Sequence, residues 1–269
     1  MQISKILISM LSVTSAFNLS KNPTYIVAPN KSKKMSTITY ARSAQKYKAK
    51  RIRMQSDPKL ITISPGGLLG FYVFGVSKYI KDNYKLDNSY IFSGASAGSW
   101  NSLFMTFNGN DDQFMDLILK NIPKNNIEKL ENNLKADVLS KYSTEDFNLN
   151  NLYIGVSSFE KYRFKLNIYS NFTSLEEALD CCIISSHIPF VTGKPCKKYK
   201  NKYAFDGGFY KYPYTNITKP ILNITPDIWD HHYPNINLFS TKDIDYNRLF
   251  LDGYEDSYKN RDILDKILL

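Results

Sequence analysis

The chain has only three cysteines and three histidines among its 269 residues. Cys181 and Cys182 are adjacent and Cys196 stands apart, so no spacing typical of a zinc site occurs. An odd cysteine count with an adjacent pair does not suggest a disulfide-bonded body. We therefore expect the cysteines to pack as small, polarisable side chains, and the sequence indicates no metal and no cofactor.

Long apolar runs are also missing. No stretch of about 18 apolar residues occurs anywhere, which is the minimum for a helix that spans a bilayer. The apolar run from Ile6 to Phe17 is too short to span and has the size of a signal-peptide core. We therefore expect no membrane-spanning helix in the mature protein.

Acidic residues are absent from residues 1–56, which carry 11 Lys and Arg. The formal charge of +10 belongs to this segment, because the rest of the chain holds 35 − 11 = 24 basic and 25 acidic residues. A nearly neutral body argues against a nucleic-acid-binding face. We expect two parts, a basic targeting leader or disordered arm over 1–56 and one domain over 57–269.

The leader itself has two sections. The apolar run is followed by small residues at a plausible cleavage point, and then by an acid-free, Ser/Lys/Arg-containing stretch from Asn18 to Met54. This order resembles the bipartite plastid leaders of algae with secondary plastids, which implies entry to the secretory route and onward transport to a plastid. The alternative is a disordered basic arm that contacts anionic lipid.

A glycine-rich loop follows the first predicted strand. Residues 60–64 form a β-branched run that ends at Pro65-Gly66-Gly67, and helical spacing of apolar residues continues through Lys81. The pattern lacks the Gly-Lys-Ser/Thr ending of a Walker loop and the later acid of a dinucleotide-binding fingerprint. The loop is therefore an oxyanion hole, whose N–H groups bind a developing negative oxygen, or a plain glycine turn.

The second predicted strand delivers a serine between two glycines. Ile91-Phe92-Ser93 leads into Gly94-Ala95-Ser96-Ala97-Gly98, and a helix follows. A serine on a sharp strand-to-helix turn exposes its Oγ, and small residues two positions away make room for that turn. Two successive strand–loop–helix units indicate a parallel α/β arrangement. We expect the glycine loop and Ser96 to meet at the carboxyl edge of the sheet.

The rest of the chain alternates helical and extended patterns. Residues 113–150 look helical, with their Lys, Asn and Glu residues on a solvated face. Strand patterns over 152–156 and 164–169 suggest a hairpin, a capped helix runs over 173–186, and 246–268 looks like one amphipathic helix. Between them, a strand ends in Asp206-Gly207-Gly208, which places a carboxylate in a narrow site or makes an ordinary turn.

These ordered motifs together resemble the patatin-like phospholipase family over residues 60–265. The segments 64–72 and 249–256 are most similar to its adipose triglyceride lipase branch. The resemblance implies a three-layer α/β/α fold with a mainly parallel sheet, no cofactor, and lipid ester hydrolysis at a membrane or lipid-droplet surface. It implies Ser96 as nucleophile, Asp206 as base and the N–H groups of Gly66, Gly67 and Leu68 as oxyanion donors; the remaining motif glycines are Gly70, Gly94, Gly98, Gly207 and Gly208.

The chain departs from the family pattern at Pro65, where the family usually has glycine. Proline has no N–H, so a donor is lost if the family uses that position. The two glycines that follow keep the loop able to supply donors, and we expect activity to remain.

Two other hypotheses remain open. His231 and His232 follow Asp206 in the chain order of an α/β-hydrolase triad, although no His-Gly-Gly-Gly motif precedes Ser96; under the dyad hypothesis these residues and His187 are bystanders. The second hypothesis is that the chain is a catalytically silent relative that binds lipid without cleaving it.

The substrate class is also open, because phospholipid, galactolipid and triacylglycerol all fit the predicted chemistry. The apolar residues near the motifs serve as core or as acyl-chain contacts: Leu68, Leu69, Phe71, Trp100 and Phe209.

Overall fold

A computed structural model of the chain describes residues 57–120, 127–160, 163–209, 217–233, 236 and 244–269. The predicted leader over 1–56 lies outside the described residues. So does the turn of the predicted hairpin at 161–162. The domain boundary and the fate of the leader therefore stay predictions.

The body is organised around a seven-stranded mixed sheet in the order β5-β6-β3-β2-β1-β7, with β4 paired to β3. The pairs β1–β2, β1–β7 and β2–β3 are parallel, whereas β3–β4, β3–β6 and β5–β6 are antiparallel. The strand bounds are β1 Lys59–Ile63, β2 Tyr90–Gly94, β3 Leu152–Glu160, β4 Arg163–Tyr169, β5 Lys197–Tyr199, β6 Lys202–Phe205 and β7 Pro220–Ile224.

Helices cover both faces of this sheet. Their bounds are α2 Gly70–Asn83, α3 Ala97–Met105, α4 Asp111–Lys120, α5 Ile127–Lys141, α6 Leu175–Ser185, α7 Tyr246–Lys259 and α8 Arg261–Leu268. Short 3-10 turns occur at Gly67–Leu69, Thr144–Asp146, Leu149–Asn151 and Gly207–Phe209.

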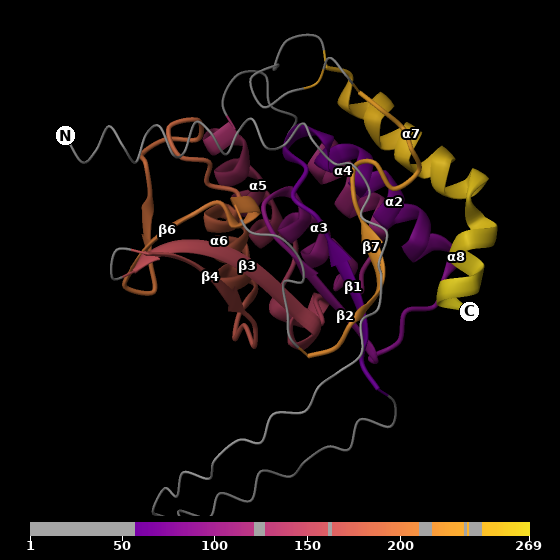
Figure 1. The fold of residues 1–269 in the computed structure, drawn as a ribbon, viewed down its shortest axis with the longest axis horizontal. Coiled ribbons are helices and arrows are strands. Elements are labelled where there is room, and N and C mark those ends of the chain that lie inside the picture. The colour runs from indigo at the N-terminus through magenta and orange to yellow at the C-terminus, as the bar shows by residue number, and fades with distance from the viewer. Residues whose placement is uncertain (1–56, 121–126, 161–162, 210–216, 234–235, 237–243) are drawn as a thin grey trace, which may run out of the picture. The chain divides into compact units, whose positions relative to one another are not determined.

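Two apolar cores separate the layers. One core lies between β1, β2 and β7 and the helices α2, α7 and α8. The other lies between β3 and the helices α3, α4, α5 and α6. In Figure 1, α7 and α8 run along the outer side of α2. The three-layer α/β/α fold with its largely parallel centre is therefore confirmed.

The register of β3 brings two distant segments together. Strand β2 runs parallel to β3 and ends with Gly94 opposite Ile154. Strand β6 runs antiparallel to β3 and ends with Phe205 opposite Ser157. Because the two strands approach each other along β3, the residues that follow them converge above Gly155 and Val156. The fold thus places the Ser96 turn beside the Asp206 turn.

Most predicted elements are confirmed, with three differences. The stretch 113–150 contains α4 and α5 and then 3-10 turns rather than continuous helix. The C-terminal helix is divided at Asn260, which ends α7 and precedes α8. Strand β5 was not expected, because its three residues are too few to show a pattern.

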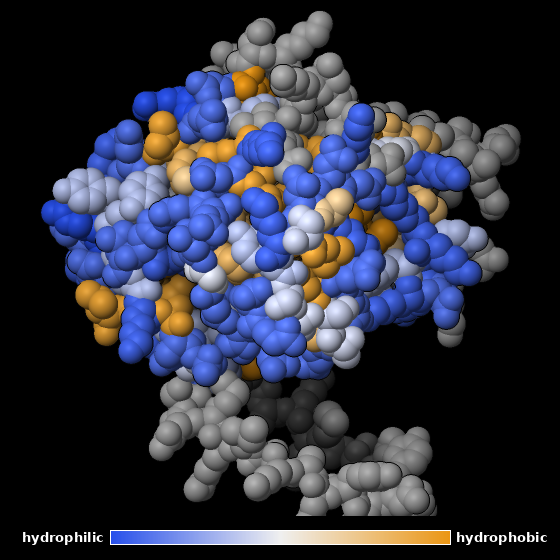
Figure 2. Space-filling model, turned by 180° about the vertical axis from the view of Figure 1, so that it is seen from behind, coloured by the Kyte–Doolittle hydropathy of each residue, from blue (hydrophilic) through white to orange (hydrophobic). Residues whose placement is uncertain are grey.

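None of the helices in the described part of the chain is both long enough and apolar enough to cross a membrane. On the face of the body seen in Figure 2, hydrophilic residues predominate and hydrophobic ones form small, separate patches among the coloured atoms.

Candidate active site

Ser96 occupies the turn between β2 and α3 in a conformation that side chains rarely adopt. Its backbone angles are φ 53° and ψ −131°, and the residue is the N-cap of α3. A positive φ at a residue other than glycine is strained and persists where surrounding contacts hold it. Ser96 is buried, with 5% of its surface exposed, and it faces a pocket.

Two close backbone approaches explain the flanking glycines. A Cβ on Gly94 would lie 2.2 Å from the carbonyl oxygen of Gly98, and a Cβ on Gly98 would lie 2.2 Å from that of Ile63. No side chain fits at either distance. The turn at Ser96 therefore requires glycine on both sides, and α3 starts directly against the end of β1.

The turn is tied to α6 by a serine that the sequence analysis did not single out. The N–H of Ser96 donates to Oγ of Ser185 at 2.8 Å, and that hydroxyl donates to the carbonyl of Gly155 at 2.7 Å. One buried hydroxyl thus links the Ser96 turn to β3. No local pattern reveals such a contact, because Ser185 lies 89 residues from Ser96.

Asp206 follows β6 and is held by the backbone. Its N–H donates to the carbonyl of His187 at 2.8 Å. The next residue must be small, because a Cβ on Gly207 would lie 2.0 Å from the carbonyl oxygen of Gly155. The strand end therefore presses closely on β3 and directs the Asp206 side chain into a buried position, with 5% of the residue exposed.

One oxygen of the Asp206 carboxyl accepts a hydrogen bond, and the other does not. Oδ1 accepts the N–H of Gly208 at 2.5 Å, whereas Oδ2 is buried and has no hydrogen-bond partner among the described residues. Burial raises the pKa of Asp206 to about 6, although the nearby Ser96 hydroxyl and the Gly208 N–H act to lower it. Catalytic hydrogen bonds are often long in a free enzyme, so this geometry suits a carboxylate that accepts a proton from Ser96.

The glycine loop lies against the same site. Gly67 has a φ of 52° and begins a 3-10 turn whose first internal hydrogen bond runs from Leu69 N to Gly66 O. The N–H groups of Gly67 and Leu68 precede that bond, so they have no partner within the turn. Pro65 lies beside the Asp206 turn, because a Cβ on Gly208 would be 3.0 Å from Pro65 Cβ.

A pocket of about 930 Å³, counting its open mouth, joins Ser96 to the glycine loop. Of the apolar residues considered from the sequence, Leu68, Phe71 and Trp100 line this pocket, whereas Leu69 packs against a core and Phe209 packs its ring on Phe205. The other lining residues are Gly67, Gly70, Phe74, Ala97, Asn101, Ile118, Leu130, Glu131, Leu134, Ser186 and Ile188.

Glu131 was expected on a solvated face, and that expectation is wrong. Only 4% of the residue is exposed, and it lines the pocket among apolar side chains. Burial raises its pKa to about 8. The stretch around Glu131 is rich in Lys, Asn and Glu, so the local pattern does not indicate that this one glutamate is buried.

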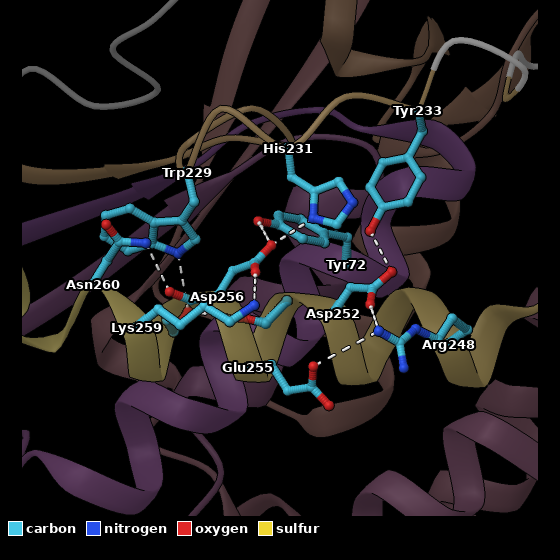
Figure 3. A network of polar contacts seen from close by, with 12 residues as sticks. Tyr72, Trp229, His231, Tyr233, Arg248, Asp252, Glu255, Asp256, Lys259 and Asn260 are labelled. Atoms are coloured by element: carbon cyan, nitrogen blue, oxygen red, sulfur yellow. Dashed lines mark hydrogen bonds and ion pairs between the residues drawn. The ribbon is translucent and has the colours of Figure 1, made fainter.

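His231 belongs to a different polar network, shown in Figure 3. Its Nδ1 donates to Oδ2 of Asp256 at 2.6 Å, and its ring stacks on Tyr233 with the centroids 4.4 Å apart. Asp256 also accepts from the Tyr72 hydroxyl at 3.1 Å. Burial acts to raise the pKa of Asp256, but hydrogen bonds, chiefly from His231, lower it. This network ties the loop after β7 to α2 and α7.

The other two histidines have different surroundings. The Nε2 of His187 donates to the carbonyl of Lys194 at 2.6 Å, which leaves Nδ1 to accept from the Thr192 hydroxyl at 3.1 Å. Both ring nitrogens of His187 are therefore engaged. His232 is exposed.

No group of three or more His, Cys, Asp or Glu side chains in the described residues is arranged to hold a metal ion. All three cysteines are free; Cys181 and Cys182 are buried as expected, and Cys196 is half-buried.

Comparison with known proteins agrees with the fold. The family model described as patatin-like phospholipase matches residues 61–215, which include the glycine loop, Ser96 and Asp206. No curated protein matches the chain significantly, and the assignment to the adipose triglyceride lipase branch stays a prediction. The chain belongs to the patatin-like phospholipase family, and hence to the lipid acyl hydrolases.

Proposed function

We propose that the protein cleaves carboxylic esters of lipids through an acyl-enzyme on Ser96, with Asp206 as its general base. The observation that carries this proposal is the convergence of the two turns on β3, which brings the turn of Ser96, a residue that lines the pocket, beside the turn of Asp206, whose Oδ2 is buried and unpaired. A serine hydroxyl is a weak nucleophile without such a base.

The reaction proceeds in two halves. Oδ2 of Asp206 takes the proton of Ser96 Oγ as Oγ bonds to the ester carbonyl carbon. The bond from that carbon to the alcohol oxygen then breaks, and the alcohol leaves with the proton from Asp206. Water next attacks the acyl-enzyme, again giving its proton to Asp206, and Ser96 leaves with that proton as the fatty acid is released.

The glycine loop stabilises the negative oxygen that forms in both halves. We assign this role to the N–H groups of Gly66, Gly67 and Leu68, with support from the partial positive charge at the start of α3, whose N-cap is Ser96. One well-placed donor of this kind lowers the barrier by about 3 kcal/mol. Pro65 supplies no N–H, so the donors must come from the residues after it.

The pocket suits an acyl chain because most of its lining is apolar. Phospholipid, galactolipid and triacylglycerol all provide such a chain, and a plastid destination for the leader would favour galactolipid. We propose that the enzyme meets its substrate as a peripheral protein at a membrane or lipid-droplet surface.

Hydrolysis of p-nitrophenyl octanoate tests the proposal. The wild-type protein should release p-nitrophenol, and Ser96→Ala should lower kcat/KM by at least about 10³-fold. Ser140→Ala, at an exposed position on α5, should behave like the wild type. Equal rates for wild type and Ser96→Ala would instead support a silent lipid-binding protein.

A further inference from the structure

Glu131 interrupts the apolar face of α5 at the point where that helix reaches the pocket. Leu134 and Val138, three and seven residues later, point into the core. Glu131 shares their face and is buried to the same degree. Burying a carboxyl among apolar side chains costs free energy unless something pairs with it, so its presence here requires an explanation.

The polar neighbours of Glu131 satisfy only part of its carboxyl. Ser186 and Trp100 lie close enough to act on it. However, the Ser186 hydroxyl already donates to the carbonyl of Cys182 at 2.9 Å and accepts from Trp100 Nε1 at 2.9 Å. It therefore has a lone pair left and no proton. The Ser186 hydroxyl can therefore accept a hydrogen bond from the O–H of a protonated Glu131. The other oxygen of the Glu131 carboxyl then remains available as an acceptor.

The charges around Glu131 agree with a protonated side chain. Among the described residues no ion pair ends on it, and only the more distant charge of Lys197 acts to lower its pKa alongside the hydrogen-bonding neighbours. The negative charge of Asp206 acts in the opposite direction and raises its pKa. Because Asp206 ionises at about pH 6, Glu131 would have to ionise against a charge already present. Glu131 and Ser96 line the same pocket, so an ester bound at Ser96 would share that pocket with Glu131.

We propose that Glu131 is a specificity-determining residue, which accepts a hydrogen bond from a hydroxyl group that the substrate carries close to its scissile ester. This inference rests on the proposed hydrolase function of Ser96. A plain alkyl chain in the pocket would leave the acceptor oxygen of Glu131 buried and unpaired. A site built to bind a hydroxyl discriminates strongly against analogues that lack it.

The hydroxyl has two possible sources, an oxygenated acyl chain or an alcohol part with a free hydroxyl. Two matched pairs of esters separate them. Ethyl 3-hydroxyoctanoate against ethyl octanoate tests the acyl side. The ester 2-hydroxyethyl octanoate against ethyl octanoate tests the alcohol side. The value compared is the ratio of kcat/KM within each pair.

In the wild type, one of the two ratios should be about tenfold in favour of the hydroxylated ester, as expected for one hydrogen bond to an otherwise unpaired group. Glu131→Leu should bring that ratio to about one. Glu131→Gln should keep most of it, because its amide donates to Ser186 and still presents a carbonyl oxygen. Glu145→Gln, an exposed site, should match the wild type.

Wild-type ratios near one in both pairs would overturn the inference, and this result needs no folded variant. A preference that survives in Glu131→Leu would also overturn it. Ser96→Ala separates this failure from failure of the proposed function: if hydrolysis of all three esters persists in Ser96→Ala, the hydrolase mechanism itself is wrong.

Discussion

The N–H of Ser96 donates to Oγ of Ser185, 89 residues further along the chain, at 2.8 Å. This bond holds the strained Ser96 turn against α6 and, through Gly155, against the strand on which Asp206 also rests. Ser185 is fully buried and is not among the residues that line the pocket. It acts as a positioning residue for the two groups that we assign to catalysis.

Ser185→Ala should therefore lower kcat more than it raises KM, by about tenfold in kcat, because the Ser96 turn loses its anchor. It also leaves a buried N–H and a buried carbonyl unpaired, which costs about 1–3 kcal/mol of stability. Steady-state kinetics with urea denaturation measures both effects, and Ser185→Thr, which keeps the hydroxyl, should recover part of kcat. An unchanged kcat in folded Ser185→Ala would contradict this role.

The pH dependence of hydrolysis should follow Asp206. A base must be ionised to accept a proton, and burial raises the pKa of Asp206 to about 6. Below that pH, kcat/KM should fall about tenfold per pH unit. A profile of kcat/KM from pH 4.5 to 8 measures this, with Glu131→Gln as the control that removes the other raised carboxyl. A flat profile between pH 5 and 7 would contradict the assignment.

The buried Glu131 should make the protein less stable as the pH rises. An unfolded glutamate loses its proton near pH 4.5, whereas the folded one keeps it up to about pH 8. Between these values the folded chain holds the extra proton, so the free energy of unfolding falls by about 1.4 kcal/mol per pH unit. Asp206 contributes the same trend only up to about pH 6.

Urea denaturation at pH 6.5 and 7.5 isolates the Glu131 effect. The wild type should lose about 1 kcal/mol more over this interval than Glu131→Gln does. Groups that titrate in both proteins cancel in the comparison. Parallel losses in the two proteins would show that Glu131 is already ionised in the folded state.

The histidines should be dispensable for chemistry. His231→Ala removes the 2.6 Å bond to Asp256 and the stacking on Tyr233, so stability should fall by about 1–3 kcal/mol while ester hydrolysis continues. His232→Ala should change neither quantity. Thermal unfolding and p-nitrophenyl octanoate hydrolysis measure the two effects. Loss of hydrolysis in a folded His231→Ala or His232→Ala protein would favour a Ser–Asp–His triad.

Local sequence patterns were enough to predict that the glycine loop and the Ser96 turn lie together. Leu60 to Ser64 and Ile91 to Ser93 are continuous apolar or β-branched runs, and parallel neighbours of this kind bring their following loops together. The Ser96 turn and the glycine loop can each be predicted from a motif of a few adjacent residues. The general fold class follows from the same alternation of strands and helices.

The parts that depend on long-range contacts were not predictable in this way. The approach of β6 to β2 along β3 is a matter of strand register between segments far apart in the sequence, as the pairs Phe92–Leu152 and Phe159–Tyr203 show. Ser185 has meaning only in that arrangement. The burial of Glu131 was not predicted because glutamate is almost never fully buried. Its burial follows from its position in the lining of the pocket, which the local sequence does not reveal.

Labelling with a fluorophosphonate probe, followed by peptide mass spectrometry, tests the central claim most directly. The probe should attach to Ser96 in the wild type and in a variant without His187, His231 and His232. The rate of labelling should fall by about 10²-fold or more in Asp206→Asn, which removes the base. Attachment at another residue, or an Asp206→Asn protein that reacts as fast as the wild type, would contradict activation of Ser96 by Asp206.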